Sequence, residues 1–352
     1  MGEDTKIAWC DHTWNPWLDC DRKAGHPGCV NCYAQDYFRR FDLVGKRRKT
    51  SDAYWRQPLK WDKQAEEEGV QRSVFLSMCD PFEDWAGPIV NAKGERLNHG
   101  IDNKYIGHAG ISALVDSQWT TMNDLRRDFF QLIDQTPNLT WILATKRPEN
   151  IRRMWVGDTV VSSSGRTHRF APHRPNVHLL YSASDQASLD AGIGHLLECR
   201  DLAPVLGLSL EPLIRPIDID QYMCSMCEGR PSNPASGYSE CPMCEGKSLS
   251  WVVCGGESGP NARPCQIEHV DDILRQCEEA GVWCFVKQMG SNAVTSNVNL
   301  FDYPRSLYPI DGRDGWKPWG EFAAGARIPF AHPKGGDPAE WPNEMRVQQH
   351  PR

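Results

Sequence analysis

The sequence predicts an α/β protein with a TIM-like or partial (β/α) barrel. Short apolar segments of strand length alternate with segments in which apolar residues recur every three or four positions, the pattern of strands and helices around a parallel sheet. Several strand segments are apolar almost throughout, which is typical of parallel strands covered on both faces. With 352 residues, 40% of them apolar, the chain is long enough to bury a substantial core.

Seven segments are predicted to be the strands of this sheet. In chain order they are Lys6–Cys10, Ser73–Met78, Thr140–Ala144, Val177–Tyr181, Val205–Leu210, Trp251–Cys254 and Trp283–Val286. Two intervening segments have apolar residues on one helical face, and each such helix is expected to pack on the sheet. The first face has Leu125, Phe129, Leu132 and Ile133, and the second has Val270, Ile273, Leu274 and Cys277.

The barrel is assigned to residues 1–290, with two insertions in it. One insertion runs from about Ala86 to Trp119 and contains Gly and Asn. The other, residues 223–248, contains four cysteines and is expected to be a small metal-binding insertion. After Gly290 the chain is rich in Pro, Gly and Trp without clear periodicity. Residues 291–352 are therefore expected to form an irregular C-terminal extension.

Polar residues follow nearly every predicted strand at its C-terminal end. They are Asp80, Lys146, Arg147, Ser182, Ser184, Asp185, Glu211, Glu257, Ser258, Lys287 and Gln288. In a (β/α) barrel these ends point to one mouth, the face on which active sites of that architecture form. Any one of these side chains is equally well explained as a loop group with its hydrogen bonds satisfied, but six strand ends together favour a site.

Charge and cysteine usage limit the class of protein. The net charge of −7 argues against broad, sequence-independent phosphate binding. A local basic cluster spans Arg39 to Lys49, where it steers an anionic substrate or forms a solvated helix end. Fourteen cysteines without an apolar signal segment indicate metal-bound thiolates in a reducing cytoplasm. No apolar run approaches the roughly 20 residues that cross a bilayer, so no membrane association is expected.

Cys20, Cys29 and Cys32 lie on a Gly- and Pro-containing loop between a strand-like and a helix-like segment. Three thiolates from one loop can hold three irons of a [4Fe-4S] cluster and leave the fourth iron open for a ligand. A structural zinc is the alternative, and it requires a fourth ligand. The candidates for that ligand are Cys10, His12 and His26.

The second cysteine group has two C-x2-C pairs with a Gly after each. Cys224 and Cys227 are separated by thirteen residues from Cys241 and Cys244. This spacing is typical of a four-thiolate structural zinc, and an insertion with few apolar residues needs a metal for its stability. A second iron–sulfur cluster is the alternative. The remaining cysteines are expected to be buried small hydrophobes, namely Cys10, Cys79, Cys199, Cys254, Cys265, Cys277 and Cys284.

A strand ending in Gly255, Gly256, Glu257 and Ser258 indicates a cofactor or substrate contact. Glycines permit a close backbone approach to a ligand, and Glu257 can accept hydrogen bonds from an ammonium group or ribose hydroxyls. A single Gly-rich turn is weak evidence. Its expected position at the barrel mouth strengthens the interpretation.

Seven motifs in order resemble a family of phage-encoded, radical-SAM-like proteins long carried as a domain of unknown function. They are Trp14–Trp17, Cys29–Tyr33, Ser77–Phe82, Thr145–Pro148, Ser209–Leu213, Gly255–Gly259 and Val286–Gly290. Two features depart from the general radical SAM pattern. The first cysteine gap is eight residues instead of three, and the Gly-Gly-Glu segment follows a later strand than usual.

The resemblance implies a radical SAM barrel in which Cys20, Cys29 and Cys32 hold a [4Fe-4S] cluster whose open iron binds S-adenosylmethionine. Asp80, Ser182, Ser184 and Glu211 become candidate cofactor contacts, together with the Gly255–Ser258 run. Lys146, Arg147, Lys287 and Gln288 become candidate catalytic residues that bind the phosphate or carboxylate of a modified nucleotide. Structural ion pairs around the rim are the alternative for these four.

Some phage members of the group resemble enzymes of thymidine hypermodification. The implied reaction is the isomerisation of a glycyl-thymidine, in DNA or as a nucleotide, with flavodoxin or ferredoxin as an electron donor, in the host cytoplasm; the modified viral DNA would evade host restriction. One alternative is a zinc-containing nucleic-acid-binding accessory protein without catalysis. Another is radical chemistry on RNA or a peptide.

Overall fold

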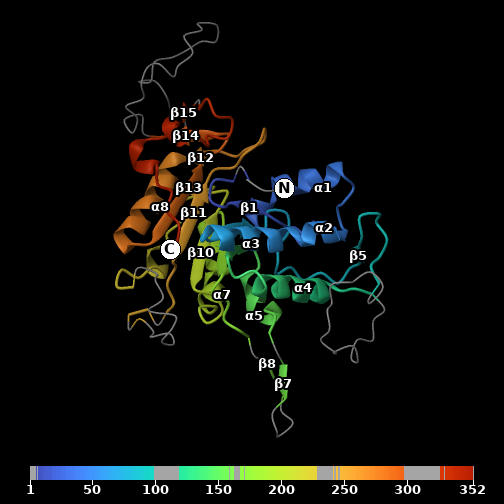
Figure 1. The fold of residues 1–352 in the computed structure, drawn as a ribbon. Coiled ribbons are helices and arrows are strands. Elements are labelled where there is room, and N and C mark those ends of the chain that lie inside the picture. Colours follow the sequence, from blue (N-terminus) through green and yellow to red (C-terminus); the bar gives the residue numbers. More distant parts are fainter. Residues whose placement is uncertain are drawn as a thin grey trace. The chain divides into compact units, whose positions relative to one another are not determined.

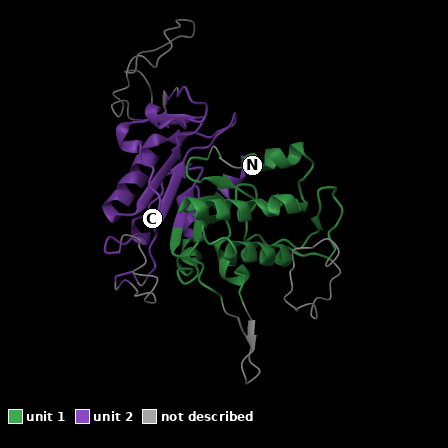
Figure 2. Ribbon diagram, viewed as in Figure 1, with its two compact units in different colours: residues 1–25, 32–181, 192–206 green, residues 26–31, 182–191, 207–352 purple. Residues whose placement is uncertain are grey.

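A computed structural model describes residues 5, 7–98, 119–157, 159–161, 167–169, 171–227, 241, 243–244, 246–296, 326–328 and 330–351. The chain divides into two compact units (Figures 1 and 2). The first unit comprises residues 1–25, 32–181 and 192–206, and the second comprises 26–31, 182–191 and 207–352. Both units contain parallel strands and helices, which confirms the predicted mixed α/β class.

In the part of the first unit that the structure describes, four strands run parallel. In spatial order they are β1 (His12–Thr13), β4 (Arg72–Phe75), β6 (Leu139–Thr145) and β9 (Val177–Ser182), the last residue of which is assigned to the second unit. The register pairs Val74 with Trp141 and Trp141 with Val177. Because the strands are parallel, their carboxyl ends meet at one edge of this unit's sheet.

The described residues of the first unit include six helices and a 3-10 turn. They are α1 (Tyr33–Arg40), α2 (Asp52–Trp55), α3 (Gln57–Glu68), α4 (Met122–Asp134), η2 (Pro148–Asn150), α5 (Ile151–Met154) and α7 (Ile193–Leu197). In α4 a reciprocal capping box between Thr121 and Asp124 fixes the N-terminus. The α4 residues Leu125, Phe129 and Ile133 are fully buried, as their helical spacing predicts.

Two short β-structures complete the first unit. Strands β2 (Trp17–Leu18), β3 (Arg47–Lys49) and β5 (Ile89–Val90) form a small sheet, and β7 (Thr159–Val161) pairs antiparallel with β8 (Thr167–Arg169). In the small sheet Trp17 is opposite Lys49 and Leu18 is opposite Arg48. This antiparallel pairing anchors the chain immediately before Cys20.

Three parallel strands and one long helix are found among the described residues of the second unit. The strands are, in spatial order, β10 (Val205–Leu210, with 205–206 assigned to the first unit), β11 (Trp251–Gly255) and β13 (Trp283–Gln288). The helix α8 (Ile267–Ala280) buries Val270, Ile273, Leu274 and Cys277, as predicted. It ends at Gly281, whose φ of +68° suits the left-handed conformation that closes a helix.

Shorter elements surround these strands. They are η1 (Pro27–Cys29), α6 (Gln186–Asp190), η3 (Asp220–Tyr222), β12 (Cys265–Gln266), β14 (Ala293–Thr295), β15 (Ala326–Arg327), η7 (Pro338–Glu340) and η8 (Asn343–Met345). β12, β14 and β15 form a three-stranded sheet. The described part of the predicted C-terminal extension, 291–352, therefore contains regular elements, and a bridge pairs Phe285 with Gln348.

Six of the seven predicted parallel strands coincide with β4, β6, β9, β10, β11 and β13. The prediction for Lys6–Cys10 is wrong, because residues 7–10 form a turn closed by the Cys10 N–H to Ile7 O hydrogen bond of 3.3 Å. Trp9 and Cys10 lie in or next to that turn and their side chains are buried. The apolar character of this segment therefore indicates burial and not a strand. Among the described residues, no helix has the length and hydropathy needed to cross a membrane.

Candidate functional site

The loop that carries Cys20 is held by a buried ionic network in the first unit. Arg47, whose side chain is 0% exposed, donates from Nε and Nη2 to the two carboxylate oxygens of Glu83 at 2.7 and 2.8 Å. Its Nη1 donates to Asp19 Oδ2 at 3.0 Å. A bidentate guanidinium–carboxylate pair with an additional partner satisfies charges that would otherwise be costly to bury.

Asp19 shapes the turn into Cys20. Its φ of +80° is unusual for a residue other than glycine, and its carboxylate accepts from the N–H groups of Cys20 at 2.9 Å and Gly45 at 2.8 Å. Gln35 of α1 donates to Asp19 Oδ1 and to the carbonyl oxygen of Cys20. The position of Cys20 is therefore specified by protein contacts alone.

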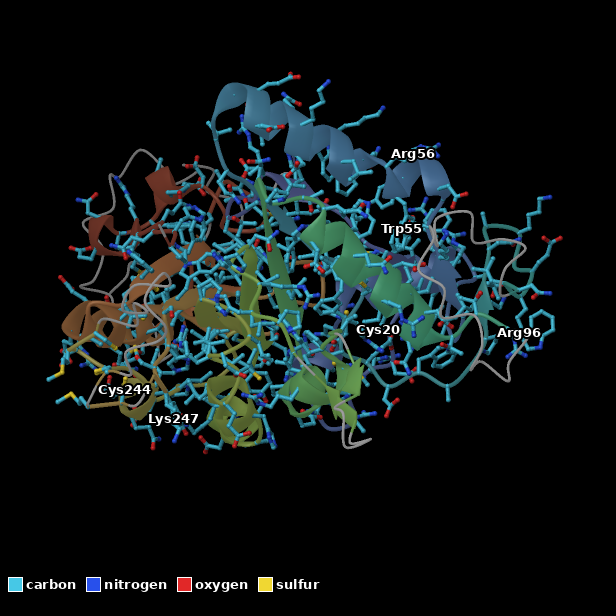
Figure 3. All side chains as sticks on the ribbon, turned by 60° about the horizontal axis from the view of Figure 1, so that its bottom comes forward. Cys20, Trp55, Arg56, Arg96, Cys244 and Lys247 are labelled. Atoms are coloured by element: carbon cyan, nitrogen blue, oxygen red, sulfur yellow. The ribbon has the colours of Figure 1, made fainter. Side chains whose placement is uncertain are left out.

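The Cys20 thiol lies within the electrostatic influence of the predicted site residues. Burial raises its pKa well above the ordinary value, and Glu83, Asp80 and Cys32 raise it further, whereas Lys146 lowers it. Figure 3 shows Cys20 among other side chains. Cys32 packs against the apolar cluster formed with Leu18 and Phe38. Cys20 and Cys32 both belong to the first unit. Among the described residues, the cysteine group whose sulfurs lie close enough to share one metal ion is Cys224, Cys227, Cys241 and Cys244, and the three predicted iron ligands do not form such a group.

Asp80 and Arg147 form a hydrogen-bonded ion pair. Asp80 accepts from Thr145 Oγ1 at 2.7 Å, from the Phe82 N–H at 3.0 Å and from Arg147 Nη1 at 2.9 Å. Arg147 Nη2 also donates to the carbonyl oxygen of Asp21 at 2.5 Å. These contacts give both residues a positioning role at the end of β6.

Cys29 is described with the second unit, at the end of the turn Pro27–Cys29. His26 caps this turn: its Nδ1 accepts from the Gly28 N–H at 3.1 Å, and its Nε2 lies 3.0 Å from the carbonyl oxygen of Ser182. Since a carbonyl only accepts, the neutral ring carries its proton on Nε2. Both ring nitrogens are occupied, which disfavours His26 as a fourth metal ligand.

Ser184 lies against the same turn. It is fully buried, and its hydroxyl has no hydrogen-bond partner among the described residues. A methyl group placed at Gly28 would approach Ser184 Oγ to 2.8 Å, so Gly28 is required there to accommodate the hydroxyl. Buried hydroxyls usually have a partner, either a protein group or ordered water, so Ser184 Oγ can still form a hydrogen bond with a bound group.

Asn31 connects the cysteine loop to Glu257. Its amide donates to Glu257 Oε2 at 3.1 Å and to the carbonyl oxygen of Asn261 at 2.9 Å. Glu257 also pairs with Arg263 at 2.6 Å. Burial opposes ionisation of Glu257, but hydrogen bonds from Arg263 and Asn31 outweigh it and hold its pKa below the ordinary value.

Gly255 and Gly256 pack closely on β13. A Cβ atom at Gly255 would lie 2.8 Å from the carbonyl oxygen of Gln288. A Cβ atom at Gly256 would collide with the carbonyl oxygen of Met289. The Gln288 amide donates to Gly256 O at 2.8 Å. Gly255, Gly256 and Gln288 therefore have a packing role in the structure. Ser258, two residues after Gly256, is half-buried.

Lys287 and Glu211 form an ion pair of 2.7 Å at the carboxyl ends of β13 and β10. Ser209 Oγ lies 3.5 Å from Glu211 Oε2, a marginal hydrogen bond. Ser182 contributes its backbone carbonyl to His26. In the second unit the predicted residues Glu211, Glu257, Lys287 and Gln288 therefore all lie at the same edge of three parallel strands.

The four-cysteine insertion forms a candidate metal centre. The sulfurs of Cys224, Cys227, Cys241 and Cys244 all lie within 4.8 Å of one another. Cys224 Sγ is 3.8 Å from Cys241 Sγ, and Cys227 Sγ is 3.6 Å from Cys244 Sγ. A tetrahedron with Zn–S bonds of about 2.3 Å has edges of about 3.8 Å. The four thiols can hold one metal ion, and the geometry is compatible with zinc.

Backbone contacts support this centre. The N–H groups of Met243 and Cys244 lower the pKa of Cys241 to about 7, whereas burial and the neighbouring thiols Cys227 and Cys241 raise the pKa of Cys244, so the thiolate is favoured at Cys241. The Leu249 N–H donates to the Tyr222 carbonyl oxygen at 2.9 Å and closes the base of the insertion. Residues 228–240, which join the two pairs, lie outside the described residues.

Several residues of the site were missed by sequence reasoning. The sequence places Arg47 in a basic cluster that steers an anionic substrate or forms a solvated helix end, whereas its side chain is buried against Glu83 and Asp19, two residues that the sequence does not single out. Asn31 was passed over although it lies between two predicted iron ligands. The seven cysteines predicted to be buried hydrophobes are all buried.

The chain matches the DUF5131 family, described as a protein of unknown function, over residues 4–325. Because the match covers most of its length, the chain belongs to that family. No curated protein matches it. No solved structure matches it either.

Proposed function

We propose that this protein is a radical SAM enzyme whose Cys20, Cys29 and Cys32 hold a [4Fe-4S] cluster. The observation that carries the proposal is the setting of these cysteines. Cys20 is fixed by Asp19 and the Arg47 network, and the unpartnered hydroxyl of Ser184 lies beside the Cys29 turn. A preorganised loop with an unused buried polar group fits a ligand that the protein binds from outside.

When bound, the cluster and S-adenosylmethionine would supply a 5′-deoxyadenosyl radical for hydrogen abstraction. The chain's own contribution is to bind and orient. Asp80 holds Arg147 and the Lys146 backbone at the end of β6, so the Lys146 ammonium group is available for an anionic group near Cys20. Glu257 fixes the cysteine loop through Asn31.

For the four-cysteine centre we assign structural zinc. The sulfur spacing suits tetrahedral Zn²⁺, and with four protein thiolates no coordination position remains for a substrate. Zinc therefore stabilises the insertion and takes no part in the chemistry.

The substrate proposed is a glycyl-thymidine, isomerised during viral DNA hypermodification that protects the genome from host restriction. The support is the resemblance of the seven motifs. Flavodoxin or ferredoxin is the proposed electron donor, and the host cytoplasm is the proposed location. A partial (β/α) barrel of the radical SAM type is the corresponding fold, supported by the parallel strands of both units.

Replacing one ligand tests the proposal. Cys29→Ala is expected to lose the cluster iron and the formation of 5′-deoxyadenosine, measured after anaerobic reconstitution and reduction. Cys265→Ala, a buried cysteine of the same unit outside both cysteine groups, is the matched control and is expected to retain both. Full activity of Cys29→Ala would contradict the proposal. Absence of iron from the wild type would favour a zinc-containing nucleic-acid-binding accessory protein.

A further inference from the structure

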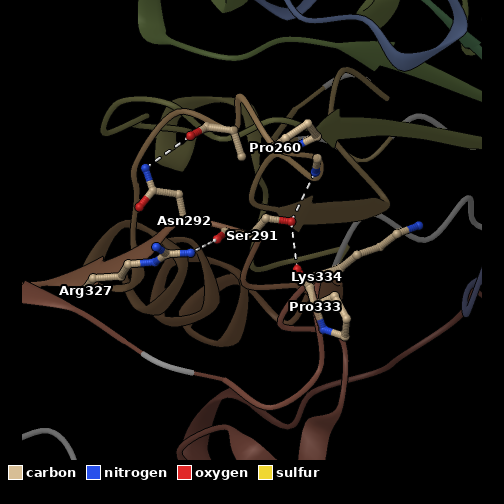
Figure 4. A pocket seen from close by; sticks show the side chains of 8 residues that line it. Pro260, Ser291, Asn292, Arg327, Pro333 and Lys334 are labelled. Atoms are coloured by element: carbon tan, nitrogen blue, oxygen red, sulfur yellow. Dashed lines mark hydrogen bonds between the residues drawn. The ribbon is translucent and has the colours of Figure 1, made fainter. Parts of the chain in front are cut away.

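A pocket of about 500 Å³ lies in the second unit, close to the Gly255–Gly259 run (Figure 4). Its lining consists of Gly259, Pro260, Ala262, Ser291, Asn292, Arg327, Pro333 and Lys334. The volume lies within the range of small-ligand sites and suits a nucleotide. None of the residues assigned above to the cysteine centres lines it.

The charged side chains that line the pocket are positive. Arg327 and Lys334 line it, and no carboxylate of a described residue does. Arg327 uses Nη2 to donate to the Ser291 carbonyl oxygen at 3.1 Å, and neither cation has an ion-pair partner among the described residues. This contrasts with neighbouring Arg263, which is paired with Glu257. In a chain of net charge −7, two unpaired cations facing one pocket favour an anion.

The pocket is held open by hydrogen bonds within its wall. Ser291 Oγ accepts from the Gly259 N–H at 3.1 Å and donates to the Pro333 carbonyl oxygen at 2.8 Å. Asn292 Nδ2 donates to the Ala262 carbonyl oxygen at 3.1 Å. Ser291 therefore joins two segments of the wall (Figure 4), while the free N–H groups of Arg327 and the Lys334 ammonium group remain for a ligand.

We propose that this pocket binds the phosphate of a nucleotide, with Arg327 and Lys334 as its ligands. A guanidinium and an ammonium group both form charge-assisted hydrogen bonds to phosphate oxygens. The choice of a thymine nucleotide rests on the proposed function, whereas the phosphate contact rests on the pocket alone. The phosphate belongs either to a free nucleotide or to a DNA strand.

Calorimetric titration with thymidine, thymidine monophosphate and a short oligothymidylate tests this proposal without any turnover. Thymidine monophosphate or the oligonucleotide is expected to bind at least about ten-fold more tightly than thymidine, as a charge-assisted hydrogen bond implies. The tighter of the two identifies the source of the phosphate. Phosphate ligands that bind no better than thymidine would overturn the proposal.

Variants then locate the site. Arg327→Ala and Lys334→Ala are each expected to weaken phosphate binding about ten-fold. Lys60→Ala, which removes an exposed cation of α3 in the first unit, is the control and should bind like the wild type. Arg327→Lys keeps the charge and should retain most of the affinity if Arg327→Ala fails to fold. Unchanged affinity in both alanine variants would contradict the assignment.

The two proposals fail separately. Loss of phosphate binding with intact 5′-deoxyadenosine formation would remove the pocket assignment only. Phosphate binding by a protein without iron would leave the pocket and remove the radical chemistry.

Discussion

The Cys20 loop and the four-cysteine insertion use the same side chain in two different settings. Around Cys20, the charged groups of Asp19, Arg47 and Glu83 are almost fully buried and paired with one another. In the insertion, Cys224 alone among the four cysteines is buried, and Met226 and Met243 are 59% and 64% exposed. Cys20 is positioned by buried protein contacts, whereas the other four cysteines lie close enough to one another to hold one metal ion.

This difference separates two ways in which a metal site relates to its fold. A loop already fixed by buried hydrogen bonds can present a thiol to a reactive cofactor at a defined position. A short segment with few apolar residues can gain much of its stability from a bound metal.

Removing the metal from the insertion has the largest expected effect. Cys241→Ser with a chelator should release one zinc per chain and expose residues 223–248 to proteolysis, since zinc contributes up to about 10 to 16 kcal/mol in isolated zinc-finger peptides. Zinc release and limited proteolysis measure this. Cys199→Ala, outside both groups, is the control. An insertion that resists protease without zinc would break the comparison.

Arg47→Met tests the network at Cys20. Removing the guanidinium group leaves the buried carboxylates of Asp19 and Glu83 uncompensated, which is expected to cost about 3 to 5 kcal/mol of the free energy of unfolding. Urea denaturation measures the loss. Arg48→Met, the next residue of β3, is the matched control and should cost far less, because Arg48 is partly exposed. Equal losses in the two variants would mean that the network does not stabilise the loop.

The Glu257–Arg263 pair predicts a smaller, pH-dependent effect. Its lowered pKa means that Glu257 stabilises the fold above the ordinary pKa near 4.5 and loses this contribution as pH falls through the lowered value. Arg263→Gln should flatten the fall in unfolding free energy below pH 4.5 by about 1 kcal/mol or less. Urea curves between pH 3 and 6 measure it, with the exposed Arg275→Gln as control. Parallel pH profiles would contradict the assignment.

Lys46→Ala is expected to have the smallest effect. Lys46 pairs with Asp42 on the surface, where the side chains are 45% and 96% exposed. Such pairs contribute about 0.5 kcal/mol or less. Urea denaturation of Lys46→Ala and Arg47→Met in one series compares the losses in the free energy of unfolding at two adjacent cations. A loss above about 1 kcal/mol would show that the exposed pair matters more than its geometry implies.

Much of the fold followed from the sequence because buried parallel strands leave a strong local signal. Apolar runs such as Val205–Leu210 and Trp251–Cys254 identified strands of the second unit. The same apolar signal wrongly predicts a strand at Trp9 and Cys10, whose side chains are buried although the backbone there forms a turn. Local apolar character reports burial, and it identifies a strand only where the backbone is also extended.

The four-cysteine centre was predictable because its pairs are local, and the structure confirms that the sulfurs can share one metal ion. The contacts around Cys20 were not predictable, because they join residues distant in sequence. Arg47 pairs with Glu83, 36 residues away, and Asn31 reaches Glu257 across 226 residues. Nothing local distinguishes the buried Arg47 from its half-buried neighbour Lys46, since only the folded surroundings set their burial.

The central claim is that the two cysteine regions hold different metals for different purposes. Anaerobic purification followed by iron, sulfide and zinc analysis tests it most directly. We expect about four irons, as one cubane cluster requires, together with one zinc per chain. The reduced protein should release 5′-deoxyadenosine from S-adenosylmethionine. A colourless protein that carries only zinc and forms no 5′-deoxyadenosine would contradict the account.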